Sequence, residues 1–238
     1  MTPDTKDGLH SRCIVALDLP RQESLEIASS LKGIASWVKV GLTLFFLEGP
    51  SIVYSLKEMG FKVFADLKLF DIPHQIEGAA RSLVTIGVDM FTLYALGGLS
   101  MMQAARAGAD EASQSRPGQA PKILAVTVLT SMDQEVLQQT GISNGLDDQV
   151  KTLASLAVEA GMDGLVSSPL EIRMLRSQVP KDKLIVTPGI RPLGSENNDQ
   201  SRTATPKTAI DEGADFIVVG RPITAALDPA QAFISLFD

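Results

Sequence analysis

Short apolar runs alternate with longer amphipathic stretches along the whole of this 238-residue chain. The runs are rich in Val, Ile, Leu and Phe, which is typical of strands buried on both faces of a sheet. We predict strands at Cys13–Asp18, Trp37–Gly41, Val63–Lys68, Met90–Tyr94, Ile123–Leu129, Gly164–Ser167, Leu184–Thr187 and Phe216–Gly220. Helical patterning predicts helices at Gln22–Leu31, Pro50–Met59, His74–Ile86, Leu99–Ala112, Gln149–Ala160, Leu170–Arg176, Pro206–Glu212 and Pro229–Phe237. Glycines that follow several of these helices are C-cap signals: Gly60, Gly87, Gly161 and Gly213.

Repeating strand–helix units favour a parallel sheet covered by helices, because parallel strands need long crossover connections. Eight such units in 238 residues fit a (β/α)8 barrel, or TIM barrel, which typically needs roughly 250 residues. An open doubly wound sheet is the competing architecture. It normally carries a glycine-rich nucleotide motif after its first strand, and Asp18-Leu-Pro-Arg21 does not resemble one. We therefore expect one α/β barrel domain over residues 1–238, with a polar extension at 1–11.

Composition narrows the function classes. The chain is 45% apolar and 21% charged, as in an ordinary globular protein. A net charge of −7 without a Lys/Arg cluster argues against binding to nucleic acid or to an anionic membrane. One cysteine, Cys13, and two histidines, His10 and His74, provide almost no material for a disulfide, a metal site or a Ser-His triad. The polar N-terminus and the lack of a long apolar run predict a soluble cytoplasmic protein.

The most informative motif is Asp66-Leu-Lys-Leu-Phe-Asp71, at the end of the third predicted strand. A period of two places Asp66 and Lys68 on the same face of that strand. Three charges at a largely apolar strand end carry a desolvation cost unless they compensate each other or meet a charged ligand. A structural ion-pair triplet explains the pattern about as well as a catalytic site does.

Further polar residues end the other predicted strands, where barrel enzymes carry their active sites. Asp18 follows the first strand, Lys39 lies in the second, and Thr130 and Ser131 follow the fifth. Pro188 and Arg191 follow the seventh. Taken singly, Lys39 could extend along the barrel rim and Asp18 could cap a helix. Together with the Asp66 motif they predict an alternating array of charges that keeps Lys68 protonated.

Gly220 and Arg221 follow the eighth strand, a position at which barrels often bind phosphate. Gly permits close approach of the backbone, and Arg offers a forked, charge-assisted contact. The polar stretch 191–206 is a candidate lid loop, from which Gln200 and Arg202 would reach a phosphate if the loop closes.

These motifs resemble those of bacterial orotidine 5′-phosphate decarboxylases, in order and over nearly the whole chain from about residue 13. The matching segments are Val15-Ala-Leu-Asp18, Lys39-Val-Gly-Leu42, Asp66-Leu-Lys-Leu-Phe-Asp-Ile-Pro73, Val126-Thr-Val-Leu-Thr-Ser-Met132, Thr187-Pro-Gly-Ile-Arg-Pro192, Asp199-Gln200 and Val219-Gly-Arg-Pro-Ile-Thr224. The family decarboxylates orotidine 5′-monophosphate (OMP) to UMP in de novo pyrimidine synthesis, without metal or organic cofactor.

The resemblance implies a role for each matching residue. Lys68 would be the proton donor, within a charged array that also contains Lys39, Asp66 and Asp71. Asp71 would be contributed to the neighbouring subunit's site, so the active form would be a homodimer. Gln75 stands where the family has a threonine that contacts the substrate of the partner subunit, and Ile72 would also bind the substrate. The remaining substrate contacts would come from Asp18 at the ribose, from Thr130 and Ser131 near the pyrimidine, from Pro188, and from Arg191, Gln200, Gly220 and Arg221 at the phosphate.

The chain departs from the family pattern in two places. Phe70, His74 and Gln75 replace the usual His, Asn and Thr after Lys68, and Tyr94 stands where His is usual. No charged residue of the array is lost, so we expect an active enzyme. The alternatives are a related metal-dependent sugar-phosphate decarboxylase or synthase, a Schiff-base aldolase, and a catalytically silent barrel that binds nucleotide phosphates. Flanking carboxylates disfavour the aldolase, because they keep a lysine protonated.

Overall fold

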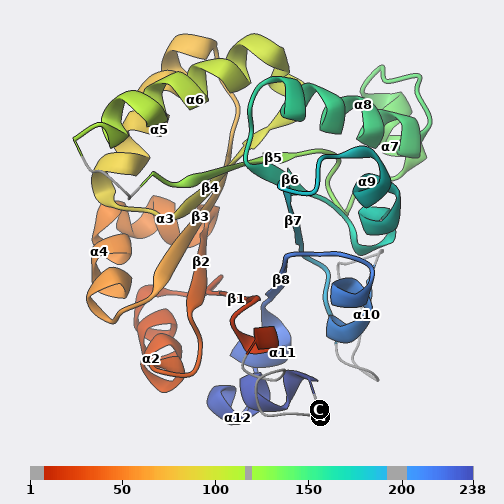
Figure 1. Ribbon diagram of the computed structural model, residues 1–238. Coiled ribbons are helices and arrows are strands. Elements are labelled where there is room, and N and C mark those ends of the chain that lie inside the picture. The colour runs from red at the N-terminus through yellow and green to blue at the C-terminus, as the bar shows by residue number, and fades with distance from the viewer. Residues whose placement is uncertain (1–7, 116–119, 192–202, 238) are drawn as a thin grey trace.

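The structure, a computed structural model, describes residues 8–115, 120–191 and 203–237. Its strands pair in parallel and in chain order, and β8 pairs with β1, so the sheet closes into a barrel (Figure 1). The predicted (β/α)8 barrel is therefore confirmed. The strands are β1 (Cys13–Ala16), β2 (Trp37–Gly41), β3 (Lys62–Leu69), β4 (Met90–Tyr94), β5 (Lys122–Val126), β6 (Gly164–Val166), β7 (Leu184–Thr187) and β8 (Phe216–Val219).

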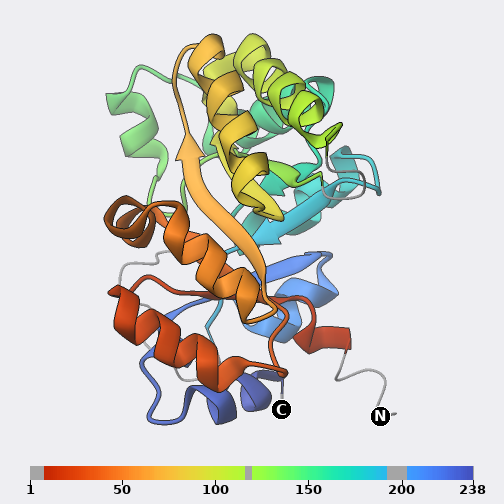
Figure 2. The ribbon, with the colours of Figure 1, turned by 90° about the vertical axis from the view of Figure 1, so that its left-hand side faces the viewer.

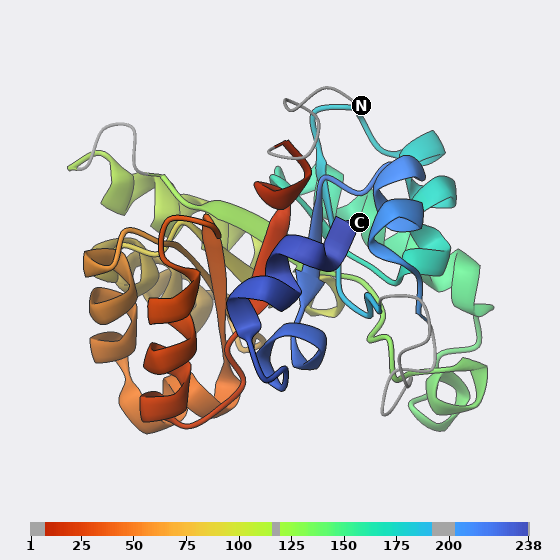
Figure 3. The same cartoon turned by 90° about the horizontal axis from the view of Figure 1, so that it is seen from below.

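Helices surround the barrel, and the C-terminal helices close the ring beside α2 (Figures 1 and 3). The longer elements are α2 (Arg21–Leu31), α4 (Pro50–Glu58), α5 (Pro73–Ile86), α6 (Gly98–Ser113) and α8 (Leu146–Glu159). The shorter ones are α3 (Leu42–Glu48), α7 (Gln134–Gln139), α9 (Ile172–Gln178), α10 (Pro206–Asp211), α11 (Arg221–Thr224) and α12 (Pro229–Ile234). Within the described part of the chain, no helix is long and apolar enough to cross a membrane.

Three of these helices were not predicted. Helix α3 has the sequence Leu-Thr-Leu-Phe-Phe-Leu-Glu, whose apolar residues are almost continuous, so it lacks the alternation of faces that marks a surface helix. Helices α7 and α11 contain six and four residues, too few to display a period. The fifth strand ends at Val126 and not at Leu129, because the chain leaves the sheet there to form the loop that carries Thr130 and Ser131.

Alternation along the strands divides the core into two layers. One set of side chains points into the barrel and forms a compact cluster of Ile14, Ala16, Trp37, Phe64, Met90, Leu124, Val186 and Val218. The other set packs outward against the helices. Two residues further along β2 and β3 from Trp37 and Phe64, the inward positions are occupied by Lys39 and Asp66. The apolar cluster is thus the floor beneath the charged residues.

Strands β4, β6 and β8 begin after a repeated Gly-x-Asp sequence. These sequences lie at the amino ends of the strands, away from Lys39 and Asp66. Each glycine has a positive φ, which ends the preceding helix. Each aspartate accepts a backbone N–H from the strand before it: Asp89 from Val63 (2.7 Å), Asp163 from Ile123 (2.9 Å) and Asp215 from Ile185 (2.7 Å). The repeat therefore joins neighbouring strands by side-chain bonds.

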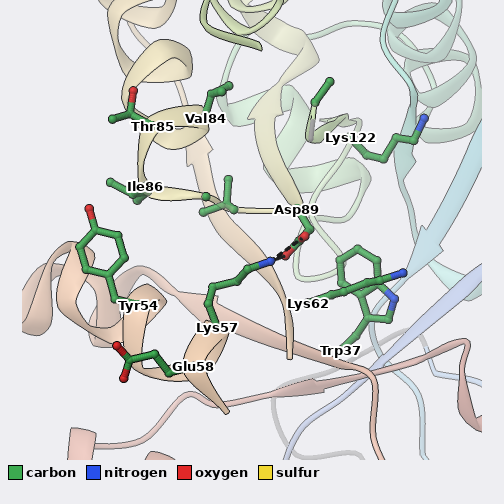
Figure 4. Close-up of a pocket in the computed structure, with 13 residues that line it drawn as sticks. Trp37, Tyr54, Lys57, Glu58, Lys62, Val84, Thr85, Ile86, Asp89 and Lys122 are labelled. Atoms are coloured by element: carbon green, nitrogen blue, oxygen red, sulfur yellow. Dashed lines mark hydrogen bonds and ion pairs between the residues drawn. The ribbon is translucent and has the colours of Figure 1, made fainter. Parts of the chain in front are cut away.

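Asp89, the aspartate of the first Gly-x-Asp sequence, borders an opening of about 760 Å³ at the amino ends of the strands (Figure 4). The Lys57 ammonium donates to both carboxylate oxygens of Asp89, at 2.8 and 2.7 Å. Lys62 lies over the Trp37 ring, 5.4 Å from its centroid. These contacts give the charges of this opening a structural function.

We expect Asp89→Ala to lower the free energy of unfolding by about 1–3 kcal/mol, because it leaves the Val63 N–H and the Lys57 ammonium without their partner. Asp89→Asn keeps an oxygen that accepts the N–H and should lose less. Urea denaturation followed by circular dichroism measures both. Asp182→Ala is the control, since the Asp182 side chain is 77% exposed. Equal losses for Asp89→Ala and Asp182→Ala would contradict the anchoring function.

Candidate active site

A cavity of about 580 Å³ opens at the carboxyl ends of the strands, above the apolar floor. Its walls come from the ends of every strand except β4, or from the loops that follow them. They include most of the site residues predicted from the sequence, namely Asp18, Lys39, Asp66, Lys68, Thr130, Ser131, Pro188, Arg191, Gly220 and Arg221. The structure therefore brings together side chains from the two ends of the sequence, from Asp18 to Arg221.

Four of these side chains form a chain of alternating charges. Asp66 Oδ2 lies 2.8 Å from Lys68 Nζ and 3.6 Å from Lys39 Nζ. Lys39 Nζ in turn donates to Asp18 Oδ1 at 2.9 Å. The side chains of Lys39 and Asp66 are only 10% and 14% exposed, whereas that of Asp18 is 57% exposed. Each buried charge is thus compensated by a neighbour of opposite sign.

Gly41 leaves the space that this array needs. A Cβ atom at Gly41 would lie 2.5 Å from Asp18 Oδ1 and 3.0 Å from Lys39 Nζ. Any larger residue would have to displace the Asp18 carboxylate. The glycine in Lys39-Val-Gly41 thus leaves room for the contact between Asp18 and Lys39.

The array shifts the pKa values of its two buried members toward their charged forms. Burial alone would lower the pKa of Lys39, but the charges of Asp66 and Asp18 outweigh it and raise that pKa. Burial alone would raise the pKa of Asp66, but Lys39, Lys68 and the hydrogen bonds from Lys68 and Thr92 lower it. Both groups are therefore charged at neutral pH.

These shifts also make the array a source of pH-dependent stability. The lowered pKa of Asp66 stabilises the fold above the ordinary pKa of an aspartate, and this contribution is lost as the pH falls through the lowered value. The raised pKa of Lys39 stabilises the fold below the ordinary pKa of a lysine, and this contribution is lost as the pH rises through the raised value.

An irregularity in β3 places Asp66 and Lys68 together. Ala65 pairs with Phe91 and Leu69 pairs with Leu93, so residues 66–68 of β3 face a single residue of β4, Thr92. Lys68 has a φ of 48°, in the left-handed region that residues other than glycine rarely adopt. Figure 2 shows β3 as a long, curved strand beside α5. The same-face prediction holds, and the bulge brings two inward side chains opposite one.

The sequence analysis missed Ser167 and Thr224, which line the cavity, and Thr92, which contacts the array from β4. Thr92 is fully buried, its Oγ1 accepts the Lys68 N–H at 2.9 Å, and its hydroxyl donates to Asp66 Oδ1 at 2.9 Å. The only signal for it was a polar residue at an inward position of the predicted strand Met90–Tyr94.

The part of the cavity wall that follows β7 and β8 carries two arginines. Arg221 begins α11 directly after Gly220, and the Arg191 side chain is buried after β7. Backbone hydrogen bonds join the chain before the loop that follows Arg191 to the chain after it. The Arg191 N–H donates to the Ala204 carbonyl, and the Ala204 N–H donates to the Gly189 carbonyl. Thr130 and Ser131 line the cavity from the loop after β5.

The remaining predicted site residues lie elsewhere. Asp71, Ile72 and Gln75 are exposed on the loop and first turn after β3 and do not line the cavity. Asp71 Oδ1 accepts the Ile72 N–H at 2.6 Å. Gln200 and Arg202, with most of the candidate lid 191–206, lie outside the described residues, as does most of the extension 1–11.

The fold and the cavity define the class of protein. It is a (β/α)8 barrel with a preorganised array of lysines and aspartates at the strand ends where barrel enzymes carry their active sites. The chain matches the Orotidine 5'-phosphate decarboxylase / HUMPS family over residues 11–234, and it belongs to that family.

Relatives and solved structures agree with this assignment. The chain is 49% identical to an orotidine 5'-phosphate decarboxylase from Maridesulfovibrio salexigens, over 93% of this chain and 95% of the relative. It is also 49% identical to the one from Moorella thermoacetica, over 93% and 88%. The crystal structure of orotidine 5'-phosphate decarboxylase from Lactobacillus acidophilus superposes with a TM-score of 0.85 at 38% identity, over 95% of this chain and 97% of that one.

We expect Lys39→Met to raise the pKa of Asp66, because the buried carboxylate then loses one of its two cationic neighbours. A ¹³C NMR titration of the Asp66 carboxyl carbon measures the change. Lys62→Met is the matched control, since Lys62 lies at the other end of the barrel over Trp37. An Asp66 titration that is the same in the wild type and in Lys39→Met would contradict the proposed compensation.

Proposed function

We propose that this chain decarboxylates orotidine 5′-monophosphate to UMP and CO2 in de novo pyrimidine synthesis, without a metal or cofactor. The observation that carries the proposal is the Lys68 ammonium, held 2.8 Å from Asp66 in a cavity that Arg191 and Arg221 also line. Family membership and relatives of the same name over most of their length support the reaction.

The chemistry explains why a fixed ammonium is needed. When the bond between C6 and the carboxyl carbon of the pyrimidine breaks, CO2 leaves and the electron pair remains on C6, an sp² carbon from which the ring does not readily delocalise it. The Lys68 ammonium stabilises this developing charge and then gives C6 a proton. Preorganised charge of this kind is often the largest catalytic term, and here Lys39, Asp66 and Asp71 would hold it in place.

The substrate's other groups find partners around the cavity. Asp18 would contact the ribose, and Thr130, Ser131 and Pro188 would lie near the pyrimidine. Gly220, Arg221, Arg191 and Gln200 would hold the phosphate, with the loop 191–206 as a lid. Because the phosphate is remote from C6, its binding energy is available to close the lid and order the charges, which raises kcat.

The proposal includes a homodimer in which Asp71, Ile72 and Gln75 complete the site of the neighbouring subunit. All three are exposed and outside their own chain's cavity. Large apolar side chains are exposed on the segments that follow β2, β3 and β4, as a covered surface would require: Phe46 and Leu47 on α3, Phe70 and Ile72 after β3, and Leu96 after β4.

We also propose a cytoplasmic location, where a phosphorylated nucleotide is retained because its charge opposes transfer into a membrane. The proposed partners are the substrate, its product and a second copy of the chain. Nucleic acid and membranes are not among them, in keeping with the net charge of −7.

We expect the wild type to convert OMP to UMP at the same rate in excess EDTA, measured by the change in pyrimidine absorbance. Lys68→Ala should reduce kcat by at least roughly 10³-fold, because it removes both the stabilising charge and the proton donor. UMP affinity, measured by calorimetry, should change little. Activity that EDTA abolishes would favour the metal-dependent sugar-phosphate chemistry, and near-normal turnover of Lys68→Ala would refute the assignment of Lys68.

Mixed dimers test the sharing of sites. We expect Lys68→Ala and Asp71→Ala to be almost inactive alone, and to recover activity when they are unfolded and refolded together. Each heterodimer then contains one site with both residues intact, so random mixing should restore about one quarter of the wild-type rate. Lys68→Ala mixed with Lys68→Ala, Asp71→Ala is the control, because no combination of these subunits restores a site. No recovery in the test mixture would count against Asp71 acting across the interface.

A further inference from the structure

We propose that Thr92 is a positioning residue for the decarboxylation, acting through Asp66 and Lys68 without touching the substrate. This inference rests on the proposed function. It concerns a residue on β4, a different strand from the two residues that it orients, and one that does not line the cavity.

The hydroxyl of Thr92 has a fixed hydrogen-bond direction. The backbone N–H of Lys68 can only donate, so Oγ1 is its acceptor, at 2.9 Å. The hydroxyl hydrogen is then directed to Asp66 Oδ1, also at 2.9 Å. One buried hydroxyl therefore joins the backbone of the lysine to the side chain of the aspartate.

This bond assigns different tasks to the two oxygens of Asp66. Oδ1 is held by Thr92, which leaves Oδ2 to face Lys68 at 2.8 Å and Lys39 at 3.6 Å. A carboxylate free to rotate would share its oxygens among the lysines in several ways. With Thr92 in place, the Lys68 ammonium has one preferred position.

The same hydroxyl supports the unusual backbone at Lys68. In the bulge, residues 66–68 have no regular partners on β4, and Lys68 has a φ of 48°. Such a conformation persists only when the surroundings hold it. The Thr92 side chain provides the acceptor that the regular ladder would otherwise supply, so it fixes the point from which the lysine side chain starts.

The test compares side chains of similar size at position 92. Thr92→Val keeps the shape and removes the hydroxyl, whereas Thr92→Ser keeps the hydroxyl. We expect Thr92→Val to lower kcat about 10- to 100-fold, since a small misplacement of a catalytic group costs this much. KM for OMP and the affinity for UMP should stay within about twofold, because Thr92 does not touch the ligand. Thr92→Ser should retain kcat within about threefold, and Thr92→Cys, a weak hydrogen-bonding group, should fall between Ser and Val.

The pH profile provides a readout that general loosening of the fold would not produce. The groups that face Asp66 are Lys39 from β2, Lys68 on its own strand and Tyr94 from β4, with Asp18 acting through Lys39. Thr92→Val removes a hydrogen bond that favours the ionised carboxylate, so the acid limb of the kcat profile should move to higher pH. Thr187→Val is the control: Thr187 is fully buried on β7 and its hydroxyl has no partner within the described part of the chain.

The possible results separate this proposal from the one on which it rests. A wild type without OMP decarboxylase activity would overturn the proposed function. An active wild type with kcat unchanged in Thr92→Val would overturn the positioning role alone. If Thr92→Val does not fold, as judged by urea denaturation, Thr92→Cys decides: a kcat equal to that of the wild type would overturn the role, and a reduced kcat with UMP affinity retained would support it.

Discussion

The carboxylate of Asp66 is the interaction on which the rest of the site depends. It is mostly buried, and it meets two ammonium groups and a hydroxyl within a few ångströms. An isolated charge at this depth would be strongly unfavourable, whereas an alternating chain from Asp18 to Lys68 compensates each member. Removal of one member leaves its neighbour buried and uncompensated, which costs more than the pair contributes. The array therefore acts as one unit.

The barrel gives this unit a rigid support. Lys39, Asp66 and Lys68 project from paired strands above a layer of apolar side chains, so the sheet fixes the backbone from which they start. The two arginines stand outside the sheet, Arg191 after β7 and Arg221 at the start of α11 after β8. The array thus stands on the sheet and the arginines stand outside it. This arrangement suits a reaction in which charge must be fixed at one end of the substrate while the other end enters and leaves.

The strands and most of the site could be predicted from local sequence patterns. Burial on both faces of the sheet requires apolar runs, and polar residues at the strand ends interrupt those runs. The bulge at Lys68 could not be predicted in this way, because it depends on how the residues of β3 pair with those of β4. Thr92 was missed for the same reason: threonine is common in strands, and its meaning depends on what lies across the ladder. The clearance at Gly41 likewise became evident only from the positions of Asp18 and Lys39.

Phe70 and Tyr94, which both depart from the family pattern beside the site, contact each other in the structure. Phe70 and Tyr94 stand on neighbouring strand ends, and their rings meet edge to face with centroids 6.0 Å apart. Burial and the charge of Asp66 raise the pKa of Tyr94, so its hydroxyl is neutral at physiological pH. A histidine at position 94 would titrate in that range and add a variable positive charge near Asp66. The aromatic pair avoids this, and the carboxylate keeps its two lysines as its only close cations among the described residues.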